Sequence, residues 1–190
     1  MKKINGLLFV IVFTLLLSAC GTKPITSQPM SSFSFTDQDG QAFGTNELTG
    51  TIWIADFIFT QCDTVCLPMM SETAALQQLF KEQGLQVKFV SFTVDPTVDT
   101  PEILKEYISQ YTDEESNWHM LTGYYQNEIE AFARDKFKTI IIKPKTSHQV
   151  LHGTSFYLVN QQGIVVKEYN YANSSYAEEL MKDIKKMQKK

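Results

Sequence analysis

The amino-acid sequence predicts a single α/β domain, and three features of the chain support this prediction. Short apolar runs with the composition of strands alternate along the chain with runs of helical period. Two further apolar runs and a last helical run close the chain after this alternation. Two cysteines, Cys62 and Cys66, directly follow one central apolar run. With 190 residues, 43% of them hydrophobic, the chain is long enough to bury one core.

The amino-terminal end has the pattern of a bacterial lipoprotein signal. Lys2 and Lys3 precede an apolar run at residues 7–17, and the tetrapeptide Leu17-Ser-Ala-Cys20 ends that run. This pattern predicts a cleaved signal peptide over residues 1–19, with a lipid attached to Cys20. An uncleaved membrane anchor is the alternative, but the apolar run is short for a membrane span. Both readings place the protein on the extracytoplasmic face of the bacterial cell membrane.

Between the predicted lipid anchor and the domain lies a polar segment. Residues 20–32 are rich in Thr, Ser, Gln and Pro, as expected of a flexible, lipid-anchored tether. Residues 33–190 then form the folded domain.

The net charge argues against nucleic acid as a partner. The formal charge is −4 at pH 7, and loss of the two lysines in the signal peptide makes it −6. The lysines within residues 185–190 form a small basic tail, which we interpret as the solvated end of the last helix.

The first half of the domain predicts a hairpin and then a strand-helix-strand unit. Residues 33–43 alternate in polarity around Asp39-Gly40, a dipeptide typical of hairpin turns. The apolar run at residues 52–59 predicts a buried strand, and residues 68–83 have helical spacing and end at a glycine. Residues 86–94 predict a second central strand, which a right-handed crossover would place parallel to the first.

The second half predicts further helices and strands. These are a helix that begins at Pro101 after the capping residue Thr100, a short strand at 118–121, a helix at 126–136, strands at 154–159 and 164–169, and a helix at about 176–188. The buried face of the first of these helices is expected to contain Ile103, Leu104, Tyr107, Ile108 and Tyr111. Residues 137–149 are expected to form an inserted hairpin or loop. This order of elements describes a thioredoxin-like α/β sandwich.

Cys62 and Cys66 are the candidate chemical groups. On a helix or its first turn, residues i and i+4 share a face, so the two sulfurs could bind one metal ion or form one disulfide. A helix N-terminus is expected to lower the pKa of these thiols. A purely structural disulfide is disfavoured because so small a loop gains little stability from closure.

Three segments together resemble the Sco/SenC family of extracytoplasmic, thioredoxin-like copper proteins, and the resemblance extends from about Phe33 to the C-terminus. The segments are Phe59-Thr-Gln-Cys62-Asp-Thr-Val-Cys66, Val94-Asp95-Pro96 and Leu151-His152-Gly-Thr-Ser-Phe156. In one departure, Leu67 intervenes between the second cysteine and Pro68, whereas many members have proline directly after that cysteine.

The resemblance implies that Cys62, Cys66 and His152 bind copper and that Asp95 supports the site. It also implies a role in maturing the dinuclear copper (CuA) centre of cytochrome c oxidase subunit II, which would be the partner. The chemistry of the residues agrees, since two thiolates suit Cu(I) and an added imidazole also accommodates Cu(II). Zinc accepts the same donors, but its structural sites usually have a fourth protein ligand.

Two enzyme classes remain as alternatives to a copper chaperone. A thiol-disulfide oxidoreductase could use the same cysteines to reduce those of the oxidase subunit, although such enzymes usually carry Cys-x-x-Cys and a cis-proline where Thr154 stands here. A peroxidase of the peroxiredoxin type lacks the expected approach to its reactive thiol, and Arg134 is the sole arginine.

Other metal-binding residue types in the chain have simpler explanations. His148 lies four residues before His152 in the polar loop and is expected to be solvated, with a role as an alternative ligand as the less favoured reading. His119 is expected to be structural. Met69 and Met70 lie at helical spacing with Leu76 and are assigned to the core.

Overall fold

The computed structural model describes residues 23–62 and 66–189. The predicted signal peptide, the predicted lipid attachment at Cys20 and the residues between the two cysteines lie outside the described residues. Within the described ranges, no helix is both long and apolar enough to cross a membrane.

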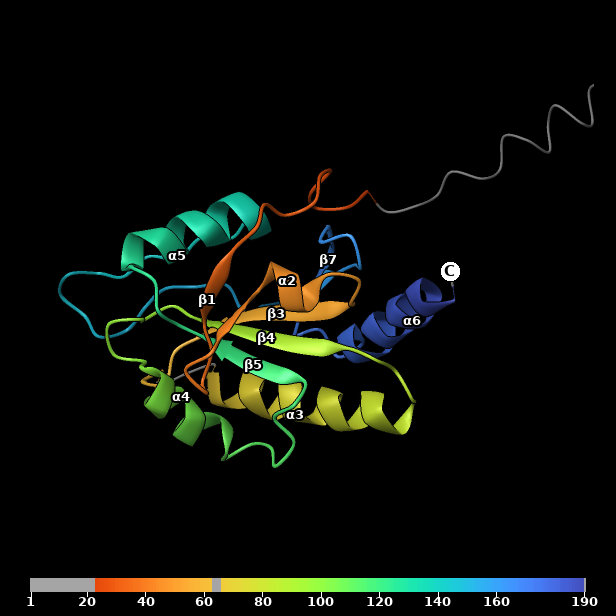
Figure 1. Cartoon of the computed structure of the whole chain (residues 1–190), viewed down its shortest axis with the longest axis horizontal. Helices are drawn as coiled ribbons and strands as arrows, with labels where there is room; N and C mark the ends of the chain where they lie inside the picture. The colour runs from red at the N-terminus through yellow and green to blue at the C-terminus, as the bar shows by residue number, and fades with distance from the viewer. Residues whose placement is uncertain (1–22, 63–65, 190) are drawn as a thin grey trace, which may run out of the picture.

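A five-stranded mixed sheet forms the centre of the domain (Figure 1). Its strand order is β5(Trp118–Leu121), β4(Lys88–Thr93), β3(Trp53–Ile58), β6(Ser155–Val159) and β7(Val165–Asn170). The first three strands are parallel, and β6 and β7 are antiparallel to their neighbours. The predicted strand-helix-strand unit and closing hairpin are therefore confirmed.

Helices cover both faces of the sheet. On one face lie α3(Cys66–Glu82), α4(Pro101–Ile108) and α6(Tyr176–Gln188), while α5(Gln126–Phe132) and the π-helical turn η1(Ala133–Phe137) lie on the other (Figure 1). The side chains of β3 alternate between the two cores: Trp53 and Phe57 pack toward α5, whereas Ile54 and Ile58 pack toward α3. This arrangement is the predicted thioredoxin-like sandwich.

The amino-terminal hairpin also agrees with the sequence. It consists of β1(Ser34–Thr36) and β2(Ala42–Gly44), which pair antiparallel and are followed by the short helix α2(Thr45–Leu48). The Asp37 carboxylate accepts hydrogen bonds from the amides of Asp39 and Gln41, and Gly40 adopts a φ of 71°. The turn thus uses glycine where positive φ is required.

Two predictions about helices are corrected. Helix α3 begins at Cys66 and not at Pro68, since proline is tolerated in a first turn, where its missing N–H costs no hydrogen bond. In α4, Ile103 is 39% exposed instead of buried, because it lies off the stripe formed by Leu104, Tyr107 and Ile108. The predicted contribution of Tyr111 falls beyond the end of α4, and its ring packs edge-on against Tyr107.

Part of the predicted tether contacts the body of the domain. The amides of Ile25 and Thr26 donate to the carbonyl of Val165 at 2.9 and 3.2 Å, and the amide of Met30 donates to Gly163 at 2.8 Å. Val165 begins β7, the last strand in the order of the described sheet, so the contacts of Ile25 and Thr26 supply hydrogen-bond partners at the sheet edge. Residues 25, 26 and 30 are thus attached to the domain, and the flexible, lipid-anchored tether over residues 20–32 stays a prediction.

The inserted segment before β6 is a loop with one cross-strand bridge. Ile142 and Leu151 exchange two backbone hydrogen bonds of 2.9 Å, and no longer ladder forms between its described residues. Pro144 and the polar residues after it explain the short pairing, since proline cannot donate to a ladder.

Candidate metal centre

The sheet topology brings Cys62, Cys66 and His152 together. Cys62 follows β3, Cys66 is the first residue of α3, and His152 lies just before β6. Strands β3 and β6 are antiparallel neighbours, with Ala55 opposite Tyr157. The end of β3 therefore lies beside the start of β6, and the Phe59 and His152 rings accordingly meet edge-on at 5.7 Å.

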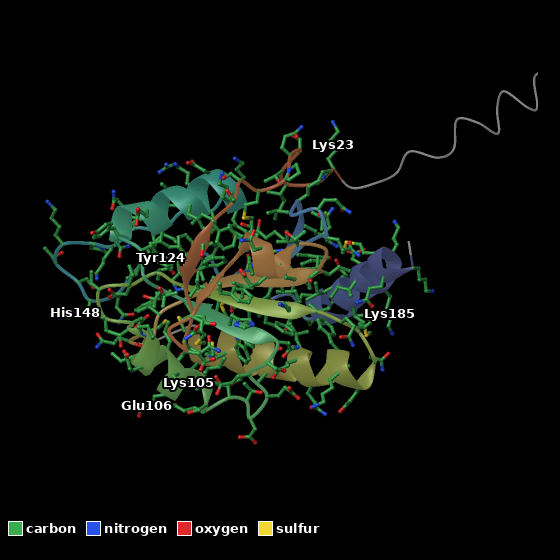
Figure 2. The ribbon with its side chains drawn as sticks, in the orientation of Figure 1. Lys23, Lys105, Glu106, Tyr124, His148 and Lys185 are labelled. Carbon is green, nitrogen blue, oxygen red and sulfur yellow. The ribbon has the colours of Figure 1, made fainter. Side chains whose placement is uncertain are left out.

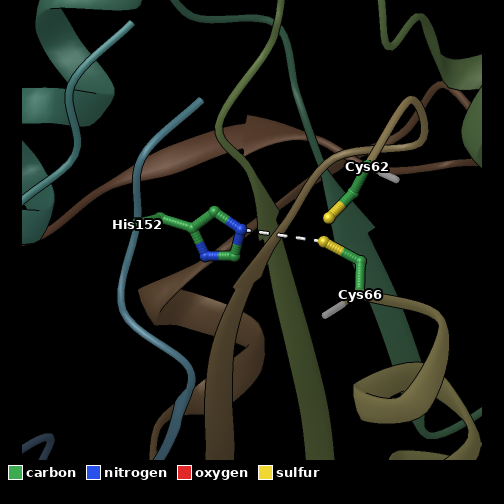
Figure 3. A group of neighbouring side chains, drawn as sticks. All are labelled: Cys62, Cys66 and His152. Carbon is green, nitrogen blue, oxygen red and sulfur yellow. Dashed lines mark hydrogen bonds between the residues drawn. The ribbon is translucent and has the colours of Figure 1, made fainter. Parts of the chain in front are cut away.

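The ligand atoms of these three residues form a compact group. The two sulfurs and a His152 ring nitrogen all lie within 4.8 Å of one another. His152 Nε2 is 3.6 Å from the Cys66 Sγ, and both sulfurs point toward the same space (Figure 3). Among the described residues, this is the sole cluster of three or more histidine, cysteine or acidic side chains with metal-binding geometry.

The hydrogen bonding of His152 leaves Nε2 available as a ligand. Its Nδ1 lies 2.9 Å from the carbonyl oxygen of Gly153, and a carbonyl can only accept, so Nδ1 carries the proton. The Nε2 lone pair then points at the thiols. A histidine ligand held by a backbone carbonyl through its other nitrogen is the usual arrangement at metal sites.

Burial governs the protonation of the site. Cys66 is fully buried, Cys62 is 8% exposed and His152 is half-buried. Burial raises the pKa of the Cys66 thiol, and the neighbouring Cys62 and the buried Asp56 act in the same direction. The expectation that the helix N-terminus lowers the pKa of this thiol is thus wrong, because desolvation outweighs the helix dipole. Burial also lowers the pKa of His152, which keeps its imidazole neutral.

The donor set fits a soft metal ion. Both cysteines are in the dithiol form, and one neutral imidazole nitrogen completes a group of two sulfurs and one nitrogen. Thiolate sulfur favours Cu(I), and the nitrogen makes Cu(II) acceptable as well. The absence of a fourth protein donor from this cluster, among the described residues, departs from the usual structural zinc site.

Asp95 does not join the ligand group. Its Oδ1 lies 2.5 Å from the Lys143 Nζ and accepts a hydrogen bond from the Thr97 hydroxyl at 2.8 Å. Lys143 belongs to the inserted loop that ends at His152, and Gln149 of the same loop donates to the Gln61 carbonyl at 2.9 Å. Asp95 is therefore placed to hold this loop. Its predicted supporting role stays a prediction.

Asp99 and Asp56 were not predicted from the sequence. Asp99 is fully buried and bonds Thr60, two residues before Cys62. Asp56 is buried within β3, and its pKa is raised to about 7 by burial. Asp56 could have been noticed in the sequence, because it is an acidic residue inside an apolar strand. Asp99 gave no such signal, because it directly precedes the helix-capping Thr100 and resembles an ordinary turn residue.

The other two histidines, and Met69 and Met70, have the locations expected. His119 stacks on Phe43 at 3.7 Å between ring centroids and lies 3.4 Å from an Asp37 oxygen. His148 is exposed on the inserted loop, at the outer edge of the molecule (Figure 2). Met69 and Met70 are fully buried in the core between the sheet and α3.

The fold and site together define a thioredoxin-like protein with a candidate site of two cysteines and one histidine for a soft metal. A family model described as SCO1/SenC matches residues 22–189. Because the match covers most of the chain, this protein belongs to the SCO1/SenC family. The family resemblance seen in the three sequence segments is thus confirmed.

Solved structures support the same assignment. The chain is 45% identical to a SCO1/SenC family lipoprotein from Bacillus anthracis, with a TM-score of 0.84 over 88% of this chain and 99% of that one. It is 41% identical to BsSco, a member of the Sco family of cytochrome c oxidase assembly proteins in which a disulfide switch has been identified; the TM-score is 0.77 over 85% and 94% of the two chains. It is 25% identical to Arabidopsis thaliana ScoI with copper bound, with a TM-score of 0.69 over 82% and 98%.

Proposed function

We propose that this protein is a copper chaperone that binds one copper ion through Cys62, Cys66 and His152. The observation that carries the proposal is the convergence of two sulfurs and one imidazole nitrogen within 4.8 Å. A related structure with copper bound supports copper as the metal. The donor chemistry supports the same choice.

The recipient in this proposal is cytochrome c oxidase subunit II, whose dinuclear copper centre the delivered copper would complete. Membership of the family and the similarity to BsSco, an oxidase assembly protein, support this partner. A lipid anchor at Cys20 would hold the protein at the extracytoplasmic face of the cell membrane, where that centre is assembled. The similarity to a bacterial lipoprotein supports the anchor.

The unequal exposure of the three ligands suggests how copper leaves the site. Cys66 is fully buried at the start of α3, whereas His152 is half-buried on a loop. An incoming donor from the recipient reaches the histidine side first, so His152 is the ligand to be exchanged first. The two sulfurs then release the metal, and each takes up a proton as it returns to the thiol form.

A copper titration of the reduced domain, truncated after Cys20, tests this function. We expect one tight equivalent with thiolate-to-copper charge transfer in the Cu(II) form. Replacing either ligand cysteine by alanine should abolish tight binding, and His152→Ala should lower the Cu(II) affinity by more than about 100-fold, beyond the loss typical of outer-shell changes. His148→Ala is the matched control on the same loop and should bind as the parent does. An unchanged affinity in His152→Ala would contradict the three-ligand site.

A second function, thiol-disulfide exchange with the cysteines of the oxidase subunit, uses the same two thiols. The proximity of the sulfurs in the dithiol form favours it, as does the disulfide switch of BsSco. In this reaction the dithiol becomes a disulfide while the partner's disulfide takes up two electrons and two protons. Reduction of a model disulfide at a rate typical of thioredoxin, by a protein that does not bind copper, would favour this alternative.

A further inference from the structure

The buried carboxylate of Asp99 lies beside Thr60, where the chain runs from β3 to Cys62. The Asp99 side chain is 0% exposed. The Thr60 hydroxyl donates to its Oδ1 at 2.5 Å, the Thr60 amide donates to its Oδ2 at 3.2 Å, and the Thr93 hydroxyl donates to the same Oδ2. Two of these three donors belong to Thr60, which lies two residues after β3 and two residues before Cys62.

The backbone of Asp99 is itself held firmly. Its amide donates to the Asp95 carbonyl at 3.0 Å, and its carbonyl accepts the Thr122 hydroxyl at 2.7 Å. Thr93 ends β4 and Thr122 follows β5, so the carboxylate of Asp99 is bonded to one strand and its backbone carbonyl to the residue after another. A residue bonded to Asp99 is thereby tied to the rigid part of the fold.

No ion pair of the described residues involves Asp99, so its buried charge relies on hydrogen bonds alone. Burial raises the pKa of this carboxyl, and the donors from Thr60 and Thr93 oppose that shift. An uncharged acceptor at this position could accept from Thr60 at a smaller desolvation cost than a buried carboxylate. The carboxylate differs in that its two oxygens accept from the hydroxyl and the amide of Thr60 together, which fixes both the place and the direction of that residue.

We propose that Asp99 is a positioning residue for the metal centre: through Thr60 it fixes the direction in which the chain runs from β3 to Cys62, and with it the separation of the two sulfurs. Cys66 is set independently by α3, so the position of Cys62 depends on how the chain leaves Thr60. The measurements of copper affinity and spectrum that test this proposal rest on the proposed function. The separation of the sulfurs in the copper-free dithiol is independent of that function.

Two variants of Thr60 isolate the hydroxyl that bonds Asp99. Thr60→Val keeps the shape and loses the donor, whereas Thr60→Ser keeps the donor. In the full chain, solubilised in detergent, we expect Thr60→Val and Asp99→Asn to lower the Cu(II) affinity by about 10- to 100-fold and to shift the thiolate-to-copper charge-transfer band. Thr60→Ser should retain the affinity and spectrum of the parent. Exchange of the Thr60 amide hydrogen, followed by NMR in the copper-free dithiol, should be about tenfold faster in Asp99→Asn, since the acceptor of that amide is weakened.

Asp37 provides a matched control, because it is also a buried acid that accepts two amide hydrogen bonds, but in the amino-terminal hairpin. Asp37→Asn should lower thermal stability without changing the copper spectrum or the exchange of the Thr60 amide. If Thr60→Val and Asp99→Asn fold and match the parent in affinity, spectrum and amide exchange, Asp99 is a structural acid only and the proposal is wrong. If Asp99→Asn does not fold, the comparison of Thr60→Val with Thr60→Ser decides.

The test separates this proposal from the proposed function. If the parent protein binds no copper, the chaperone function fails, but the dithiol-disulfide equilibrium of the cysteine pair with glutathione still reports the separation of the sulfurs. A displaced equilibrium in Thr60→Val that Thr60→Ser restores would support positioning by Asp99 without copper. Equal equilibria in the parent and both variants would overturn it.

Discussion

Protonation of Cys66 and His152 sets how the candidate site responds to pH. Burial raises the pKa of the Cys66 thiol and lowers the pKa of the His152 imidazole. At neutral pH the copper-free site therefore holds a proton on Cys66 but none on His152 Nε2. Copper must displace the thiol proton, so the apparent affinity should rise with pH, by up to about tenfold per pH unit for each proton released.

Competition titrations with a Cu(I) chelator between about pH 6 and pH 8 check this dependence. His152→Ala should keep the pH dependence of the parent's copper affinity, because the imidazole that it removes is neutral and releases no proton when it binds copper. Cys66→Ser should lower the slope of that dependence by the one proton that Cys66 no longer releases. An affinity that is independent of pH in the parent would show that Cys66 is already a thiolate in the copper-free protein.

Among the elements, the inserted loop before β6 determines whether His152 reaches the thiols. The Lys143–Asp95 ion pair and the Gln149–Gln61 hydrogen bond connect this loop to the rest of the site. Gly153 closes the loop against Thr139, whose hydroxyl oxygen would lie 2.8 Å from a Cβ at that position. The imidazole is thus presented by a segment with anchors at several points.

Loss of the Lys143–Asp95 pair should weaken copper binding through His152. Lys143→Met leaves the buried Asp95 carboxylate without its cation, so the loop should loosen and the Cu(II) affinity should fall by about tenfold. Asp95→Asn should have a similar effect. In a His152→Ala background neither change should lower the affinity further, which a double-mutant cycle measures.

A different result would assign Asp95 another role. If Asp95→Asn weakens binding in the His152→Ala background while Lys143→Met does not, Asp95 acts on the metal centre directly. Lys145→Met, a change of an exposed lysine on the same loop, serves as the control and should leave the affinity unchanged.

Over the whole molecule, the parts that the sequence predicted are those encoded by local patterns. Except for the short helix α2, which was not predicted, each strand and helix is marked in the sequence by a run of period two, a buried apolar run or a helical stripe. The spacing of the cysteine pair indicates its own chemistry. The helix start at Cys66 and the exposed Ile103 were missed because they depend on one or two residues at an element's edge.

The residues around the ligands were less predictable, because their contacts join segments far apart in the chain. Asp99 meets Thr60 across 39 residues, and Lys143 meets Asp95 across 48. His152 was assigned by resemblance, and the antiparallel pairing of β3 with β6 explains its place only once the strand order is known. The raised pKa of Cys66 likewise depends on burial, which the helix position alone did not reveal.

The buried acid in the central strand makes the stability of the whole domain depend on pH. Asp56 is 2% exposed, one of its carboxyl oxygens has no hydrogen-bond partner, and burial raises its pKa from 3.8 to about 7. The folded state thus binds this proton more tightly than the unfolded chain does. The stabilising effect of the neutral acid is complete below pH 3.8 and is lost as the pH rises through about 7.

Replacing Asp56 by asparagine should remove this dependence, since the amide stays neutral at every pH. Below pH 3.8, where Asp56 is protonated in both the folded and the unfolded parent, the variant and the parent should unfold at similar urea concentrations. Above about pH 8 the variant should be more stable, by an amount on the order of 4 kcal/mol if the full shift applies. Urea denaturation across this range measures the difference, and because both proteins share every other titrating group, that difference belongs to Asp56. Parallel stability curves for the two proteins would mean that Asp56 is ionised in the folded domain at neutral pH.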